Sequence, residues 1–192
     1  MADATSTSSA PPSSGTGTPN AASTAAGSPR ERAAGWFETV YMAAVATRAM
    51  AEDALGDAHT PELRAVLERA RDDARRHEQA AVALLAAVGR EPARTRELGG
   101  VLTAKGGEAL NWLYALSDGI IGTWRSVHML YVNASNSRQA FVVAQQLARA
   151  IGEEQAAAQL APVIDEQNAL VATLLETIAS TAPRAMLERA AI

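Results

Sequence analysis

Apolar side chains recur every three or four positions along most of the chain, and this spacing predicts amphipathic α-helices. A first helix is expected over residues 28–55, because Ser28-Pro29-Arg30-Glu31 combines a capping serine, a first-turn proline and a glutamate three residues after the serine. Thr60-Pro61-Glu62 repeats this start signal before a second predicted helix over 61–88, which Gly89 is suited to end.

Two more helices are predicted beyond a long, glycine-rich connection at 89–107. The spacing of apolar residues predicts a helix over 108–134, a turn at Ser135-Asn136-Ser137, and a last helix over 138–180. Pro162 falls inside that last helix and is expected to kink it or to split it in two. Two helices, a long connection and two further helices predict an all-α four-helix bundle with one crossover between its second and third helices.

The N-terminal segment, residues 1–27, has a different composition from the rest of the chain. Ser, Thr, Ala, Gly and Pro dominate it, and Asp3 is its only charged side chain. Such a segment cannot bury enough apolar surface to offset its ordering entropy, so we expect a disordered tail, either a spacer or a tether to a larger partner. The predicted domains are this tail, a helical bundle over 28–182 and a short C-terminal segment over 183–192.

Composition and charge exclude several classes of function. The 192 residues include no cysteine, so disulfide scaffolds, thiolate metal sites and thiol catalysis are excluded. The net charge of −4 gives no reason to expect nucleic-acid binding, which favours a basic surface. No apolar stretch reaches the roughly 18 residues needed to span a bilayer. The segment at 1–27 also lacks the basic start and apolar middle of a secretory signal, and we expect a cytoplasmic protein with no membrane partner.

Two of the predicted helices carry an ionisable residue within an apolar stripe. The stripe of the second helix reads Leu63, Leu67, Ala70, Ala74, His77, Ala81, Leu84 and Val88. The stripe of the fourth reads Val143, Leu147, Ala150, Glu154, Ala157, Ala161 and Ile164. A buried histidine or glutamate is costly unless it is paired or bound to something, so His77 and Glu154 are the leading candidates for a functional site.

Two short motifs add a family resemblance. Pro61-Glu62-Leu63-Arg64, at the start of the second helix, and Gly152-Glu153-Glu154-Gln155 resemble the YciE/YciF type of ferritin-like protein, with similarity over roughly residues 36–180. The resemblance implies a ferritin-like bundle. In di-metal members of that superfamily, iron or manganese is held by a Glu from each of two helices and by a Glu-x-x-His from each of the other two.

Compared with that pattern, the ligand set of this chain is incomplete. The residue three before His77 is Ala74, and the residue three after Glu154 is Ala157. The candidate metal ligands are His77, Glu154, Glu153, Asp73, Glu52 and His128. We therefore expect no cofactor, with His77 and Glu154 hydrogen-bonded to each other or to Thr47 or Thr123; iron or manganese is expected only if the metal interpretation holds.

The function expected from the resemblance is that of a non-catalytic ferritin-like bundle, a stress-associated, interaction or assembly component. The alternatives are a di-metal carboxylate protein with oxidoreductase or iron-handling activity, and a cargo or adaptor of a larger assembly. The tryptophans Trp36, Trp112 and Trp124 lie off the best apolar stripes. They either pack under the crossover or form a dimer surface, and we expect a homodimer, with a further protein partner at the N-terminal tail as an additional hypothesis.

Overall fold

The computed structural model describes residues 27–92, 122–188 and Ile192. Within these ranges the chain forms four α-helices and no β-strand, which confirms the predicted all-α class. The helices are α1 (Pro29–Gly56), α2 (Pro61–Ala87), α4 (Thr123–Ala150) and α5 (Glu154–Met186). None of the four has a stretch long and apolar enough to cross a membrane.

The predicted ends of the first two helices are confirmed to within one residue. The backbone N–H of Glu31 donates to Oγ of Ser28 at 3.2 Å, and the backbone N–H of Ser28 donates to Oε2 of Glu31 at 2.6 Å, which completes a capping box. The hydroxyl of Thr60 accepts the backbone N–H of Leu63 at 3.3 Å at the start of α2. Gly89, with a φ of 74°, follows the end of α2 in the left-handed conformation that favours glycine.

The predicted turn at Ser135-Asn136-Ser137 is wrong, because α4 runs through these residues to Ala150. The chain reverses instead at Gly152, whose φ of 81° suits glycine. This change moves the boundary between the last two helices by about four turns. The predicted helix over 108–134 is confirmed from Thr123 onward, but it does not run through Gly122, which is the N-cap of α4 and has a φ of 61°. Residues 108–121 lie outside the described part of the chain.

Pro162 does not split α5, which runs from Glu154 to Met186 as one helix. Its ring lies on the exposed side of the helix, where the missing backbone donor leaves no buried group unsatisfied. Pro183 also lies within α5, so the helix extends beyond the expected end near residue 180.

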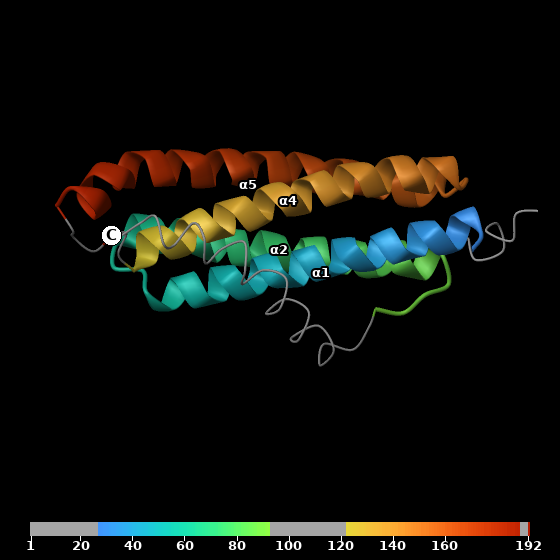
Figure 1. Ribbon diagram of the computed structural model, residues 1–192, viewed down its shortest axis with the longest axis horizontal. Coiled ribbons are helices and arrows are strands. Elements are labelled where there is room, and N and C mark those ends of the chain that lie inside the picture. Colours follow the sequence, from blue (N-terminus) through green and yellow to red (C-terminus); the bar gives the residue numbers. More distant parts are fainter. Residues whose placement is uncertain (1–26, 93–121, 189–191) are drawn as a thin grey trace, which may run out of the picture.

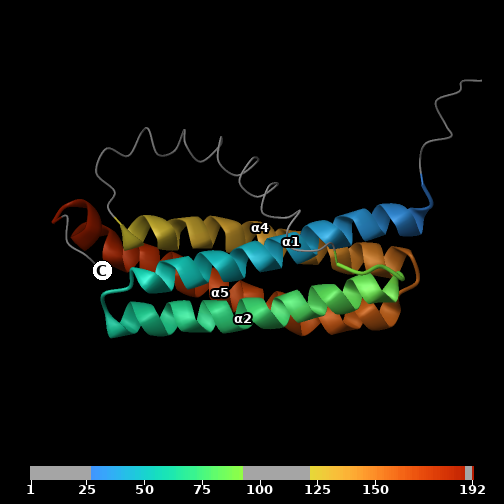
Figure 2. The same cartoon turned by 90° about the horizontal axis from the view of Figure 1, so that it is seen from below.

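The four helices form an elongated bundle, in which α1 packs against α2 and α4, and α5 packs against α4 and α2 (Figures 1 and 2). At one end, Arg30 near the start of α1 donates to the carbonyl of Ala87, the last residue of α2, at 2.5 Å. Arg30 also pairs with Glu153, just before α5, at 2.7 Å. At the other end, the hydroxyl of Thr123, the first residue of α4, donates to the carbonyl of Asp57 at 2.5 Å. Helices α1 and α5 therefore run in one direction, and α2 and α4 run in the opposite direction.

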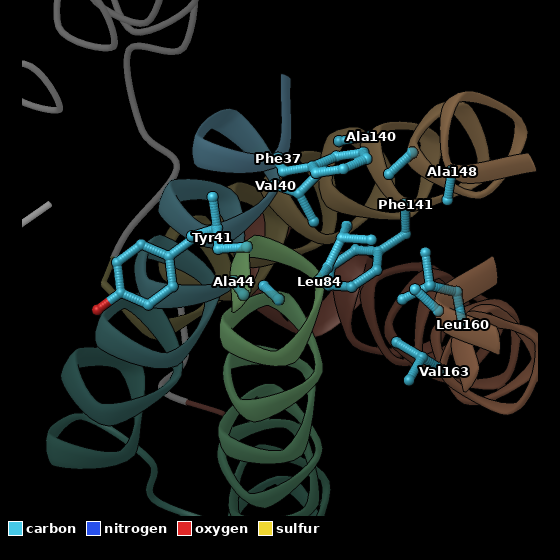
Figure 3. Close-up of a cluster of buried hydrophobic side chains, with 14 of the residues drawn as sticks. Phe37, Val40, Tyr41, Ala44, Leu84, Ala140, Phe141, Ala148, Leu160 and Val163 are labelled. Atoms are coloured by element: carbon cyan, nitrogen blue, oxygen red, sulfur yellow. The ribbon is translucent and has the colours of Figure 1, made fainter. Parts of the chain in front are cut away.

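The apolar core consists of two clusters at different levels of the bundle. In the first, Phe37, Leu84, Phe141 and Leu160 bring one side chain from each helix toward the bundle axis (Figure 3). The second cluster lies toward the opposite end and also contains residues from all four helices, among them Ala51, Leu67, Leu130 and Leu174.

Trp124 belongs to the second cluster, so the prediction that it lies off the core is wrong. Its side chain is buried, and its indole N–H donates to the carbonyl of Ile178 at 3.0 Å. Trp36 is 36% exposed, and its indole N–H donates to the carbonyl of Ala140 at 3.0 Å. Trp112 lies outside the described residues.

Candidate functional site

Polar residues occupy the level of the bundle between the two apolar clusters. On α2, for example, Ala70 belongs to one cluster and Ala81 to the other, and the buried Asp73 and His77 lie between them. All four helices contribute to this level, which we call the central polar layer. It comprises Thr47 from α1, Asp73 and His77 from α2, Asn133 and Ser137 from α4, and Glu166 and Gln167 from α5.

On the α1–α4 side of the central polar layer, the polar groups satisfy one another. The amide Nδ2 of Asn133 donates to Oγ1 of Thr47 at 2.8 Å, and the Thr47 hydroxyl donates to the carbonyl of Ala43 at 2.8 Å. Thr47 therefore contacts Asn133 and not His77, contrary to one of the expected pairings. This part of the layer is a structural hydrogen-bond network that ties α1 to α4.

On the α4–α5 side, two buried side chains are joined by a single hydrogen bond. The amide Nε2 of Gln167 donates to Oγ of Ser137 at 3.1 Å, and both residues are 2% exposed. The other amide atom, Oε1 of Gln167, is buried without a hydrogen-bond partner in the described structure. A buried amide oxygen without a hydrogen-bond partner is destabilising. The hydrogen bond from Gln167 to Ser137 therefore forms at the expense of an unsatisfied Oε1.

Arg76 carries the ion pairs of the layer, one within α2 and one from α2 to α5. Its Nη2 lies 2.5 Å from Oδ1 of Asp73 and 3.3 Å from Oε2 of Glu166. Arg69 adds a longer contact, with its Nε 3.7 Å from Oδ2 of Asp73. Burial acts to lower the pKa of Arg76, but Glu166 and Asp73 outweigh this effect and raise it above its usual value. The guanidinium is therefore a permanent cation between two carboxylates.

His77 is the most enclosed ionisable residue of the layer, with 2% of its surface exposed. Its ring meets the ring of Phe141 edge to face, with centroids 6.0 Å apart. Its Nε2 lies 3.3 Å from Oε2 of Glu166, close enough for an ion pair, although the two atoms do not have hydrogen-bond geometry. Burial lowers the pKa of His77, and the carboxylates of Glu166 and Asp73 only partly oppose this effect. The imidazole is therefore neutral at pH 7.

The prediction that Glu154 shares the core with His77 is wrong. Glu154 is exposed in the first turn of α5. Glu166, the carboxylate that does reach His77, lies about 18 Å further along the helix axis at 1.5 Å per residue. The error follows from the misplaced turn, because the reversal at Gly152 starts a new helix and resets its register. Glu153 lies at the bundle end, where it pairs with Arg30 at 2.7 Å.

The remaining candidate ligands are distributed over different parts of the bundle. Glu52 lies on the outside between α1 and α2, where it pairs with Arg48 and Arg75, each at 3.2 Å. His128 is half-buried and stacks on Trp124, with ring centroids 5.5 Å apart. Thr123, the other expected partner of His77, bonds instead to Asp57 at the end of the bundle.

Asp73 is buried, although it is not a member of the predicted apolar stripe of the second helix. It precedes Ala74, a member of the predicted apolar stripe, by one position, which is about 100° around the helix, yet it is 4% exposed. The side chains of Arg69 and Arg76 flank it, and the stem of Arg76 can shield its carboxylate from solvent. Asp73 therefore joins His77 in the central polar layer.

A di-metal centre does not fit the residues of this layer. In the described part of the chain, no three His, Asp or Glu side chains converge as they would to hold a metal ion. The layer offers one imidazole and two carboxylates where the ferritin-like pattern uses about six ligands. Arg76 also takes up oxygens of both carboxylates, so a metal ion would have to displace a bound cation. The orphaned Oε1 of Gln167 supplies only a neutral donor.

A separate pocket of about 420 Å³ lies between the end of α1 and the start of α4. Its lining includes Met50, Asp53, Asp57, Gly122 and Met129. It lies at the Thr123 end of the bundle and is not lined by residues of the central polar layer. The enclosed polar residues and this open pocket are therefore distinct features.

Comparison with known proteins gives no match: no protein-family model, no curated protein and no solved structure matches the chain. The function must therefore be inferred from the bundle and from its central polar layer.

Proposed function

We propose that the chain is a ferritin-like helical bundle without a di-metal centre, which acts as a structural, interaction or assembly component and not as an enzyme. The helix directions support the ferritin-like part of the proposal. Ala87 at the end of α2 and Thr123 at the start of α4 lie at opposite ends of the bundle, beside Arg30 and Asp57 respectively. The two helix ends that the connection joins thus lie at opposite ends of the bundle, as they do on either side of the single long crossover of ferritin-like folds.

The proposal that the bundle has no di-metal centre depends on one observation, the position of Arg76 between Asp73 and Glu166. In di-metal relatives, metal cations bridge carboxylates that project from facing helices into the middle of the bundle. Here a guanidinium bridges a carboxylate of α2 and a carboxylate of α5 at the same level. Because arginine remains charged at all physiological pH values, it can supply the compensating charge without a metal ion.

The environment of His77 supports a structural role over a catalytic one. A general base has to come within hydrogen-bond distance of its substrate. The imidazole is 2% exposed and packs against Phe141, so a substrate would reach it only if helices moved apart. The resemblance to YciE/YciF-type bundles is the reason for placing the role among stress-associated, interaction or assembly functions.

Replacement of Arg76 tests whether the guanidinium holds the position of a cation. In Arg76→Met, the carboxylates of Asp73 and Glu166 lose the cation between them and are free to turn toward His77, with which they do not converge in the parent. We expect millimolar Mn²⁺ or Zn²⁺ to raise the melting temperature of this variant and to leave that of the parent unchanged, because a ligand stabilises the folded state that binds it.

Arg75→Met is the matched control. Arg75 and Arg76 have side chains that are both 53% exposed, but Arg75 pairs with Glu52 and Asp72 on the outside of the bundle. The control variant should behave like the parent. Metal stabilisation of the parent would contradict the proposal, and equal responses of the two variants would contradict the special position of Arg76.

A further inference from the structure

One carboxylate oxygen, Oε2 of Glu166, faces two competing partners from α2. It lies 3.3 Å from Nη2 of Arg76, 3.4 Å from Nε of the same guanidinium, and 3.3 Å from Nε2 of His77. Arg76 has a second and closer partner in Asp73, at 2.5 Å. The guanidinium can therefore release Glu166 and still remain paired.

We propose that Arg76, His77 and Glu166 form a proton-controlled latch between α2 and α5, in which protonation of His77 transfers the Glu166 carboxylate from Arg76 to the imidazolium. While His77 is neutral, Glu166 pairs with Arg76, and this partly exposed ion pair joins the two helices. Uptake of one proton from solvent gives an imidazolium whose Nε2–H can donate to Oε2 of Glu166. A pair with the buried imidazolium then replaces the pair with the half-exposed guanidinium, and Arg76 remains with Asp73.

The surroundings of His77 explain why protonation would act on this carboxylate. From α2, the charged groups near the imidazole are Asp73 and Arg76, and from α5 the charged group is Glu166. Helix α4 presents the uncharged ring of Phe141. On α1, Arg48 is already paired with Glu78 and Glu52.

Glu166 also provides a route for the proton. Its side chain is 40% exposed, whereas that of His77 is 2% exposed, so the carboxylate links the buried ring to solvent. Burial holds the pKa of His77 below its usual value, which keeps the latch in its neutral state at pH 7. The latch would therefore respond to acidification, whatever the partner of the bundle.

Side-chain NMR on the full chain from pH 8 to pH 5 tests this proposal. We expect His77 to titrate below the usual pKa of a histidine, and the Nε resonance of Arg76 to shift with the same midpoint as His77. The charge of His77 also acts directly on Arg76, so the signature of partner exchange is a shift of the Arg76 resonance that becomes much smaller in Glu166→Gln, which has no carboxylate to exchange.

Two variants and one control show how Glu166 and Arg76 each change the titration midpoint of His77. Glu166→Gln should lower the titration midpoint of His77 further, because the attractive charge is lost. Arg76→Met should raise it, because a repelling cation is removed and Glu166 is released. Glu176→Gln, which removes an exposed carboxylate from the same helix, should leave the midpoint unchanged. The proposal is overturned if His77 titrates at or above the usual pKa of a histidine, or if Glu166→Gln leaves the midpoint of His77 unchanged. It is also overturned if the Arg76 resonance does not follow the titration of His77, or if His77 stays neutral until the parent unfolds.

Discussion

Asp73→Asn is the substitution that most sharply separates the buried ion pair of the bundle from its many surface pairs. It removes one negative charge with almost no change in shape. The carboxylate side chain is 6% exposed, but its partner Arg76 is 53% exposed. Exposed pairs contribute roughly 0–1 kcal/mol, and breaking a fully buried pair costs about 3–5 kcal/mol, so an intermediate loss of about 1–3 kcal/mol is expected.

The loss can be measured as the change in the free energy of unfolding from urea titrations followed by circular dichroism. For a bundle of this size, each kcal/mol corresponds to a decrease of about 2–4 °C in melting temperature. Asp72→Asn is the matched control, because Asp72 is the preceding residue and its 50% exposed side chain pairs with Arg71 and Arg75 on the surface. The control should lose much less stability than Asp73→Asn.

A double-mutant cycle identifies the partner responsible for the loss. Arg76→Met should destabilise the parent more than it destabilises Asp73→Asn, because in the second background the charge it compensates is already gone. Equal losses in Asp72→Asn and Asp73→Asn, or an additive cycle, would refute the reasoning that a buried carboxylate depends on Arg76.

Three further predictions concern pH, packing and assembly. Burial lowers the pKa of His77 in the folded state, so on acidification the unfolded chain binds a proton at this histidine before the folded chain does. The contribution of His77 to the free energy of unfolding should therefore be constant above about pH 6.5. Below that pH it should decrease by at most about 1.4 kcal/mol per pH unit. Urea midpoints should show this contribution in the parent and lack it in His77→Leu, and identical pH profiles would contradict it. Gln167→Leu combined with Ser137→Ala removes a hydrogen bond together with the unpartnered Oε1, so the free energy of unfolding of this double variant, measured in urea, should stay within about 1 kcal/mol of the parent. Gln167→Ala alone should lose about 2–4 kcal/mol, because it leaves a cavity. A larger loss in the double variant than in Gln167→Ala would contradict the burial of Gln167. Light scattering at micromolar concentration should detect a homodimer that Trp36→Ala weakens, and a strict monomer in the parent would disprove this expectation.

The first two helices could be predicted from the sequence because their ends are encoded locally. The capping box at Ser28 and the cap at Thr60 depend only on side chains within one turn of the helix start. The stripe of the second helix was also correct, and it placed His77 in the core. Such signals do not require knowledge of the neighbouring helices.

The boundary between the last two helices was predicted wrongly because the sequence contains two turn signals, Ser135-Asn136-Ser137 and Gly152, and only Gly152 forms the turn. Ser135-Asn136-Ser137 has a composition typical of turns, but burial of Ser137 and its bond to Gln167 hold these residues in a helix. Gly152 was the true signal, since a positive φ of 81° favours glycine. Once the turn is placed there, the three/four spacing from Leu160 to Ile178 predicts the observed core face of α5.

The candidate site could be predicted only in part, because its partners come from different helices. His77 was identified by its position in an apolar stripe, but Glu166 could not be assigned to it without the correct register of α5. Asp73 is not a member of the apolar stripe of the second helix, so the spacing alone does not predict its burial. Its burial depends on Arg76 and on the position of α5, and neither can be read from the spacing of apolar residues.

Elemental analysis of the parent protein, purified without chelator, tests the central claim most directly. If Arg76 supplies the cation that links the carboxylates of α2 and α5, iron, manganese and zinc should each be present at well below about one ion per chain, even after growth in metal-supplemented medium. About two ions per chain, lost in variants of Asp73, His77 or Glu166, would contradict the account and favour a di-metal carboxylate protein.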